Sequence, residues 1–362
     1  MTRGRLAAAL AVVLVAATVV RTRAAQPEAA PPPAAPAGRL PERLAETGLY
    51  LPGTSTVDPR NRAFSPQYPL WTDGAHKSRW IQLPPGSRIV ARDADRWEFP
   101  VGTRLWKEFA FEGRKVETRM LWRATADAWT YASYVWNEAQ TEATLAPPEG
   151  LPDVAAVAPG KRHAIPSRDD CRTCHENGDA NVLGFSALQL SPDRDPGAPH
   201  AEPLQPGMIT LRTLVDEGLI EAPAGLFARP PRIPGDARTR STLGYLSANC
   251  GHCHNPAGTV ATVRFPLRMP AYATAAQVDE IVAALVARTT RWDLPHSEPG
   301  TTAAIRPGAP DLSALFVRMR SRRPSSQMPP LGTTVPDRDA VDLVSAWIAG
   351  LAPRGAGSAA GQ

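Results

Sequence analysis

Hydrophobic and polar residues alternate along the first part of the chain in the way that β-strands require. In RLWKEFAFEG (residues 104–113), Leu105, Lys107 and Phe109 fall on one side of an extended chain and the residues between them fall on the other. The sequence FEGRK then predicts a hairpin turn before the next aromatic and β-branched run. Residues 42–150, with seven of the nine tryptophans, are therefore predicted to form an antiparallel β-rich domain in which the tryptophans pack the core.

The second part of the chain has apolar residues at helical spacing. The segments with this pattern are 208–221, 237–250, 274–289 and 336–353. In the last of them, Asp337 is the expected N-cap, and Gly350 marks the expected end. The fold class predicted from these patterns is α+β with several domains: the β-rich domain, a loop-rich region over 151–235 and an all-α domain over 236–352.

The N-terminus has the pattern of a secretory signal. Basic residues precede an apolar run at 6–20, and small residues follow it. This run of 15 residues is short for a membrane-spanning helix, which needs about 20. We expect a signal peptide over 1–25, a Pro/Ala-rich linker over 26–41 and a periplasmic protein, with membrane contact only if the signal is not cleaved. The tail 353–362 is expected to be disordered.

The formal net charge of +5 owes much to the targeting segment. Residues 1–25 hold four arginines and no acidic residue, so the exported chain carries a formal charge of +1. No dense basic run remains, which removes the main support for binding nucleic acid. The sequence indicates no particular oligomeric state.

All four cysteines lie in two C-x-x-C-H units. The units are Cys171-Arg172-Thr173-Cys174-His175 and Cys250-Gly251-His252-Cys253-His254. This is the attachment signal of c-type haem. On a helical turn the two thiols share a side and can reach the two vinyl groups of one porphyrin edge, and the following imidazole can bind the iron. The sequence therefore predicts two covalent haem c groups, with His175 and His254 as iron ligands.

Other uses of paired cysteines fit the sequence less well. Zinc ribbons place two C-x-x-C pairs about 15–20 residues apart, whereas 75 residues separate Cys174 from Cys250. A thioredoxin-like motif needs no following histidine and expects a βαβ setting. Two structural disulfides would suit an exported protein, but they would not explain why a histidine follows both pairs.

A methionine thioether on the second face of the iron would raise the reduction potential and suit electron transfer. Met328, in the proline-rich loop SSQMPPLG before the last predicted helix, is the predicted sixth ligand of the second iron. For the first iron we prefer Met208, and His163, His200 and an open position are the alternatives. Arg306 is expected to pair with a haem propionate, because a guanidinium group matches a carboxylate.

The region from RTRSTLGYLSANCGHCHN to SQMPPLGTTVPDRDAVDLVSAWIAGL resembles class I cytochrome c. It has a helix, a C-x-x-C-H unit, a methionine loop and a C-terminal helix in that order, over about 115 residues. In that fold the first and last helices pack together. The resemblance implies that Leu243 and Leu246 lie near Val344 and Trp347.

Nearly the whole chain, from about residue 45 to 351, resembles a family of exported bacterial dihaem cytochromes. The matching stretches include YPLWTDGAHKSRWIQLPPG, IPSRDDCRTCH and YLSANCGHCHN. The resemblance implies the same domain order and two haems, and it assigns no reaction.

Three functions fit these observations. We favour an electron-transfer protein that exchanges electrons with redox partner proteins in the periplasm. The alternative is a dihaem peroxidase-like enzyme or small-molecule oxidoreductase with the first haem as an open active site, although the sequence shows no convincing catalytic acid–base pair. A third is a binding module that uses the Trp-rich β domain to recognise a ligand.

Overall fold

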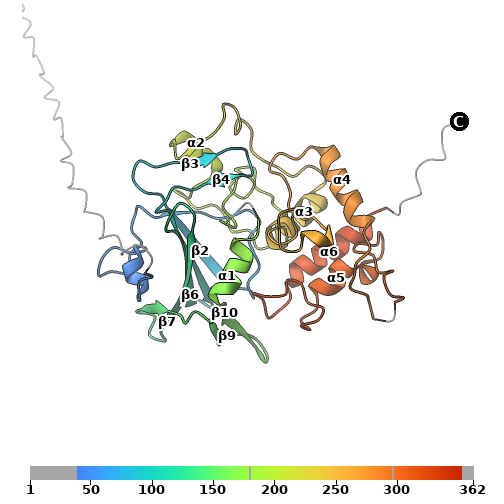
Figure 1. Ribbon diagram of the computed structural model, residues 1–362, viewed down its shortest axis with the longest axis horizontal. Coiled ribbons are helices and arrows are strands. Elements are labelled where there is room, and N and C mark those ends of the chain that lie inside the picture. Colours follow the sequence, from blue (N-terminus) through green and yellow to red (C-terminus); the bar gives the residue numbers. More distant parts are fainter. Residues whose placement is uncertain (1–38, 179–180, 296, 353–362) are drawn as a thin grey trace, which may run out of the picture. The chain divides into compact units, whose positions relative to one another are not determined.

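The computed structural model describes residues 39–178, 181–295 and 297–352 (Figure 1). The predicted signal peptide (1–25), nearly all of the linker (26–41) and the tail (353–362) lie outside the described residues. Within the described ranges, no helix has both the length and the hydropathy that crossing a bilayer requires.

The largest element of the fold is an antiparallel sheet of six strands (Figure 1). Its strands are β1 (Arg62–Ala63), β2 (His76–Gln82), β5 (Arg104–Phe111), β6 (Arg114–Arg123), β7 (Trp129–Trp136) and β8 (Ala143–Leu145). They are hydrogen-bonded in the order β1-β2-β5-β6-β7-β8. Apart from the excursion through β3 and β4, the order in space follows the order in sequence, as in a β-meander.

The hairpin predicted at FEGRK is confirmed between β5 and β6. Phe111 pairs with Arg114, which leaves Glu112 and Gly113 as a two-residue turn. Both turn residues have positive φ, 49° and 77°. This is the backbone that a type I′ turn requires, and its twist matches that of the flanking strands.

The two faces of the sheet pack against different cores. Trp106 of β5 belongs to one core together with Leu44 of the short 3-10 helix η1 (Leu44–Thr47). Its neighbour Leu105 belongs to a second, larger core that contains Phe185. The alternation predicted for this strand is therefore confirmed, and it serves a sheet that is covered on both faces.

Two smaller sheets accompany the large one. An antiparallel hairpin is formed by β9 (Leu151–Ala158) and β10 (Lys161–Ile165). The short strand β11 (Ile220–Glu221) pairs in parallel with β3 (Ile89–Ala91), which pairs antiparallel with β4 (Trp97–Glu98). The segment predicted to be loop-rich thus supplies a hairpin and one further strand.

Helices form within all four segments where the sequence predicted them, and a further helix at Ala314–Met319 was not predicted. The α-helices are α1 (Arg168–His175), α2 (Leu211–Asp216), α3 (Ala237–Asn249), α4 (Ala275–Val286), α5 (Ala314–Met319) and α6 (Arg338–Gly350), and two further 3-10 helices are η2 (Ala261–Val263) and η3 (Pro310–Leu312). Asp337 caps α6, because its carboxylate accepts a hydrogen bond from the backbone N–H of Ala340. This cap also agrees with the prediction.

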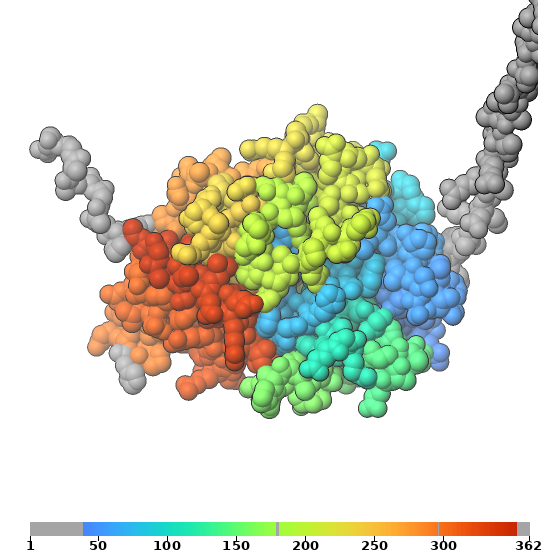
Figure 2. Space-filling view, turned by 180° about the vertical axis from the view of Figure 1, so that it is seen from behind, coloured from blue at the N-terminus to red at the C-terminus, as the bar shows by residue number. Residues whose placement is uncertain are grey.

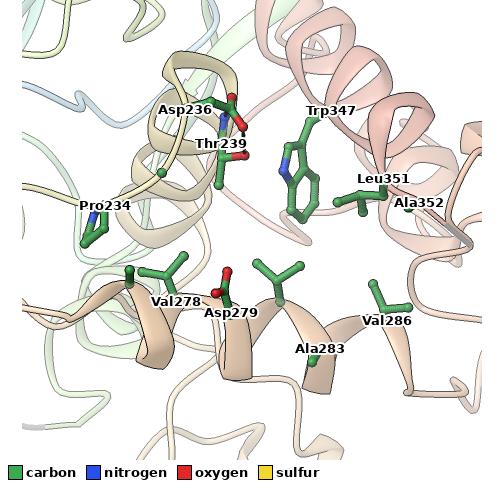
Figure 3. A pocket seen from close by; sticks show the side chains of 13 residues that line it. Pro234, Asp236, Thr239, Val278, Asp279, Ala283, Val286, Trp347, Leu351 and Ala352 are labelled. Atoms are coloured by element: carbon green, nitrogen blue, oxygen red, sulfur yellow. Dashed lines mark hydrogen bonds between the residues drawn. The ribbon is translucent and has the colours of Figure 1, made fainter. Parts of the chain in front are cut away.

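The predicted fold class is wrong. The described part of the chain is β-rich and 22% helical, and no all-α domain like class I cytochrome c is evident in it. Helices α3 and α6 do pack against each other. Together with α4, however, they surround a pocket of about 320 Å³ instead of closing a core of their own, and Trp347 and Val286 line this pocket (Figure 3).

The physical reason is a hydrophobic core shared by distant parts of the chain. Phe64 and Tyr68 belong to the same buried cluster as Leu246 of α3 and Val344 of α6. At Gly244, an added Cβ would overlap the ring of Tyr68, so the two segments touch without a gap. The C-terminal helices bury their apolar faces against the N-terminal half, and they need no separate domain.

Polar contacts fix the same arrangement. The backbone N–H of Trp71 donates to Oδ1 of Asn249 (2.7 Å), and the indole N–H of Trp71 donates to the carbonyl of Val335 (2.9 Å). On the surface, residues late in the chain (red) directly border early residues (blue), as Figure 2 shows. The loop before α6 is therefore held by the segment just before β2.

Candidate functional site

The first C-x-x-C-H unit forms the last turns of α1. Ser167 caps this helix: its hydroxyl accepts a hydrogen bond from the N–H of Asp170 (3.0 Å), whose carboxylate accepts one from the N–H of Ser167 (3.0 Å). This reciprocal capping box starts the helix at a fixed point. Cys171 and Cys174 are consequently one helical turn apart, and His175 follows on the next position.

The second unit adopts a similar turn at the end of α3. The N–H of Cys250 donates to the carbonyl of Leu246 (2.9 Å), which continues the helical pattern. The carbonyl of Cys250 then accepts from the N–H groups of Cys253 (3.1 Å) and His254 (2.8 Å). The local geometry that haem attachment needs is therefore present at both units.

The imidazole of His175 is oriented by a backbone carbonyl. Its Nδ1 lies 2.7 Å from the carbonyl oxygen of Asn181, so Nδ1 carries the proton and Nε2 keeps a free lone pair. The side chain of Asn181 in turn donates to the carbonyl of His175 (3.0 Å). Burial lowers the pKa of His175 to about 4. A neutral ring with one nitrogen anchored is the form in which histidine binds metals.

The second histidine has a different setting. Its ring lies edge-on to Phe265, with centroids 5.8 Å apart. Burial, and then the charge of Arg318, lower the pKa of His254. Its Nδ1 is buried without a hydrogen-bond partner among the described residues. His254 is thus also neutral, although a backbone hydrogen bond with Phe265 opposes part of the lowering of its pKa.

All four cysteines are half-buried free thiols with raised pKa values. Burial raises the pKa of Cys174 to about 12 and that of Cys250 to about 12. Thiolates, the form that zinc requires, are therefore disfavoured here. A thioether sulfur carries no charge and is buried at little cost, so the surroundings suit covalent haem attachment.

The fold brings the two units together although 75 residues separate them in sequence. The side chain of Asn177, just after the first unit, donates to the hydroxyl of Thr259 (3.0 Å) and accepts from its N–H (2.5 Å). An added Cβ at Gly178 would approach the amide of Asn255 to 3.0 Å. Two groups attached at these units would accordingly be neighbours.

A cavity of about 150 Å³ lies between the first unit and the six-stranded sheet. Cys171, Cys174 and His175 line it on one side, and Arg79, Lys107 and Arg119 of the sheet line it on the other. Also in its lining is His252, a residue that lies within the second unit. The first unit therefore adjoins a partly enclosed cavity.

Met328 lies in the loop that was predicted to supply a ligand. Its N–H donates to the carbonyl of Arg318 (3.0 Å), the residue whose charge acts on His254. Pro329 and Leu331 of the same loop line the cavity of the first unit. The loop thus adjoins both units. By contrast, Met208 is not in the lining of that cavity, and its sulfur accepts a hydrogen bond from the N–H of Gln205 (3.4 Å).

Both histidines proposed as alternative ligands have other partners. His163 is buried between Oδ2 of Asp73 and Oε1 of Glu117, each 3.0 Å from one ring nitrogen. His200 contacts Oδ1 of Asp337 through Nε2 (2.8 Å). Neither ring lies in the lining of the cavity beside His175. In the structure, these two histidines hold the fold together.

The basic residues of the cavity were not predicted from the sequence. The sequence did contain one indication of them. The strand pattern places Lys107 on the same face as Leu105 and Phe109, where a lysine is unexpected. Arg79 and Arg119 lie on neighbouring strands, and only the sheet register reveals that they join it.

The residues at both units fit covalently attached haem. Each supplies two uncharged thiols one turn apart and a neutral histidine whose remaining nitrogen can bind iron. Among the described residues, no group of three or more His, Cys, Asp and Glu side chains is arranged to hold a metal ion by itself. No protein-family model, curated protein or solved structure matches the chain.

Proposed function

We propose that the chain is an exported dihaem c-type cytochrome that transfers electrons between redox partner proteins in the periplasm. One observation carries the proposal: two C-x-x-C-H turns, distant in sequence, are folded side by side, each with a half-buried histidine whose pKa is lowered. The secretory pattern at residues 1–25 supports the location, because haem c is attached outside the cytoplasm.

The protein's part in this function is to hold, orient and shield. Bound haem supplies one-electron chemistry at its iron. The cysteines fix the position of each group, and the carbonyl of Asn181 fixes the ring of His175. Packing of the two units through Asn177 and Thr259 supports direct exchange between the two sites.

Counting covalent haem tests the proposal. We expect two haems per chain when the full-length protein is exported in a host that matures c-type cytochromes. C171S/C174S and C250S/C253S should each retain one haem, whereas the control R172K, inside the first unit, should retain two. Colourless protein with free, bridged or zinc-bound cysteines would refute it.

The surroundings of His175 give a second candidate some support. Met208, the preferred sixth ligand of the first iron, and the alternatives His163 and His200 make other contacts. An open first iron would suit a dihaem peroxidase-like enzyme or small-molecule oxidoreductase. Carbon monoxide binding to one reduced haem, together with rapid peroxide turnover, would favour this enzyme over the electron carrier.

A further inference from the structure

Three basic side chains form a row across the sheet, opposite the first C-x-x-C-H unit. Arg79 of β2 is paired in register with Lys107 of β5, and Lys107 with Arg119 of β6. Residues opposite each other on neighbouring strands point to the same face. All three line the cavity that also contains the thiols of the first unit.

The protein balances the charges of this row only in part. Arg79 pairs with Glu202 (3.0 Å), and Arg119 pairs with Glu117 (2.5 Å). Lys107 has no acidic side chain within ion-pair distance among the described residues. In addition, Nη2 of Arg79 is buried without a hydrogen-bond partner. Burying a charged group or a hydrogen-bond donor without a partner destabilises the fold, and a bound anion would remove this penalty.

Lys107 is affected both by its burial and by the charges of its neighbours. Burial, and then the charges of Arg79 and neighbouring cations, hold the pKa of Lys107 well below its ordinary value. An anion in the cavity would relieve both causes, because it would solvate the ammonium group and offset the neighbouring charges.

The row also has a direction relative to the thiols. Tyr131 of β7 lies beside His175, with ring centroids 5.3 Å apart. Going across the sheet from β7, Arg119 of β6 comes first, then Lys107 of β5 and then Arg79 of β2. Arg79 is two strands away from Arg119, about 10 Å at the usual strand spacing. The basic row therefore begins near the attachment cysteines and extends away from them.

We propose that Lys107 and Arg79 bind the two propionate groups of the haem attached at Cys171 and Cys174. The inference rests on the proposed function, since it requires that haem. Vinyl and propionate groups occupy opposite edges of a porphyrin, which matches a row that starts at the thiols and ends at Arg79. Arg306, the residue that the sequence suggested for this role, is instead exposed.

Potentiometric titration of the exported dihaem protein tests the inference. In K107M, removal of the cation leaves a propionate uncompensated, which favours the oxidised iron. We expect one of the two reduction steps to become about tenfold less favourable, a fall of about 59 mV for one electron. K107R should restore the wild-type value. K161M, which removes an exposed lysine on β10, is the matched control.

The outcomes separate the inference from the proposed function. Wild-type protein without covalent haem would refute the function itself. If K107M carries two haems and neither reduction potential shifts more than it does in K161M, the proposed function stands and the propionate assignment is wrong. If inorganic phosphate shifts the potential of the wild type but not of K107M, the row binds soluble anions, which also overturns the assignment. Loss of one haem in K107M but not in K107R would support it.

Discussion

The first C-x-x-C-H turn lies on α1 beside the six-stranded sheet, whereas the second follows α3 in the helical part of the chain. Around the first, Lys107 and Arg119 of the sheet line the same cavity as the histidine. Around the second, Phe265 and Arg318 approach the histidine. The two turns share their local geometry and differ in what the fold places next to them.

The two copies of the motif therefore form sites that are not equivalent. A backbone carbonyl anchors His175, while Nδ1 of His254 has no partner among the described residues. Hydrogen bonding and nearby charge both tune haem potentials. Two sites with unequal surroundings are therefore expected to have unequal potentials, and electron flow between them would have a direction.

The largest expected effect concerns the buried network that supports the first site. His163 bridges Asp73 and Glu117, and Asp73 also accepts hydrogen bonds from the N–H groups of Thr334 (2.7 Å) and Val335 (3.0 Å). H163A leaves two carboxylates buried with one partner fewer, so we expect a loss of about 3–5 kcal/mol in the free energy of unfolding. Denaturant titration measures it.

The matched control for this variant is H76A, because His76 is an exposed histidine on the same sheet. Its free energy of unfolding should stay within about 0.5 kcal/mol of the wild type. Equal losses in both variants would mean that the network does not stabilise the first site's surroundings.

The network also has a pH dependence. Burial opposes the charged form of His163, but the hydrogen bonds to Asp73 and Glu117 outweigh it and raise its pKa. The stability that protonated His163 adds is therefore fully present below the pKa of this histidine in the unfolded chain, about 6.5. It is lost as the pH rises through the higher pKa of His163 in the folded protein. Burial likewise opposes the charge of Glu117, but Arg119 and His163 lower its pKa to about 2.

The stability that the ionised carboxylates of Asp73 and Glu117 add is fully present above about pH 4.5 and is lost as the pH falls. We therefore expect wild type and H163A to differ most between about pH 4.5 and 6.5, and to approach each other at alkaline pH. A difference that stays constant from pH 5.5 to pH 9 would contradict the assigned protonation of His163.

The second prediction tests the sixth ligand. M328L removes a thioether while nearly keeping side-chain volume, so we expect the reduction of the second haem to become about a hundredfold less favourable, about 118 mV for one electron. M208L is the control and should leave this step unchanged. A shift of the first haem instead would assign Met328 to the cavity that its loop also borders.

The third prediction tests whether the two regions share a core. G244A inserts a methyl group into the ring of Tyr68, and we expect it to destabilise the fold by about 2 kcal/mol despite the better helix propensity of alanine. G350A is the matched control in α6, where an added Cβ would meet only Arg238 at 3.7 Å. It should be neutral or stabilising by up to about 1 kcal/mol. Equal effects would indicate a loose contact.

The smallest expected effect concerns the contact between the two units. N177A removes both hydrogen bonds to Thr259, and we expect a loss of about 1 kcal/mol. A double-mutant cycle with T259V isolates the energy of the hydrogen bond to the Thr259 hydroxyl, because the backbone N–H of residue 259 remains in that variant. Additive losses would show that this bond does not couple the two units, and an unchanged stability of N177A would show the same for the bond from the backbone N–H.

Local features of this protein follow from the sequence alone. The hairpin at Glu112-Gly113 and the helix capped by Asp337 were predictable, because turn backbone and capping depend on neighbouring residues only. The spacing of each C-x-x-C-H unit likewise determines that the thiols share a side of one turn. The cysteines and histidines of the candidate site were therefore identifiable without a structure.

How these parts combine depends on contacts between segments that are distant in the sequence. The predicted all-α domain was wrong, because α3 and α6 bury their apolar faces against Tyr68 and other residues far away in sequence. The contact of Asn177 with Thr259 and the register that aligns Lys107 between two arginines are likewise long-range. Such contacts depend on shape complementarity and burial between distant segments, and no local pattern records them.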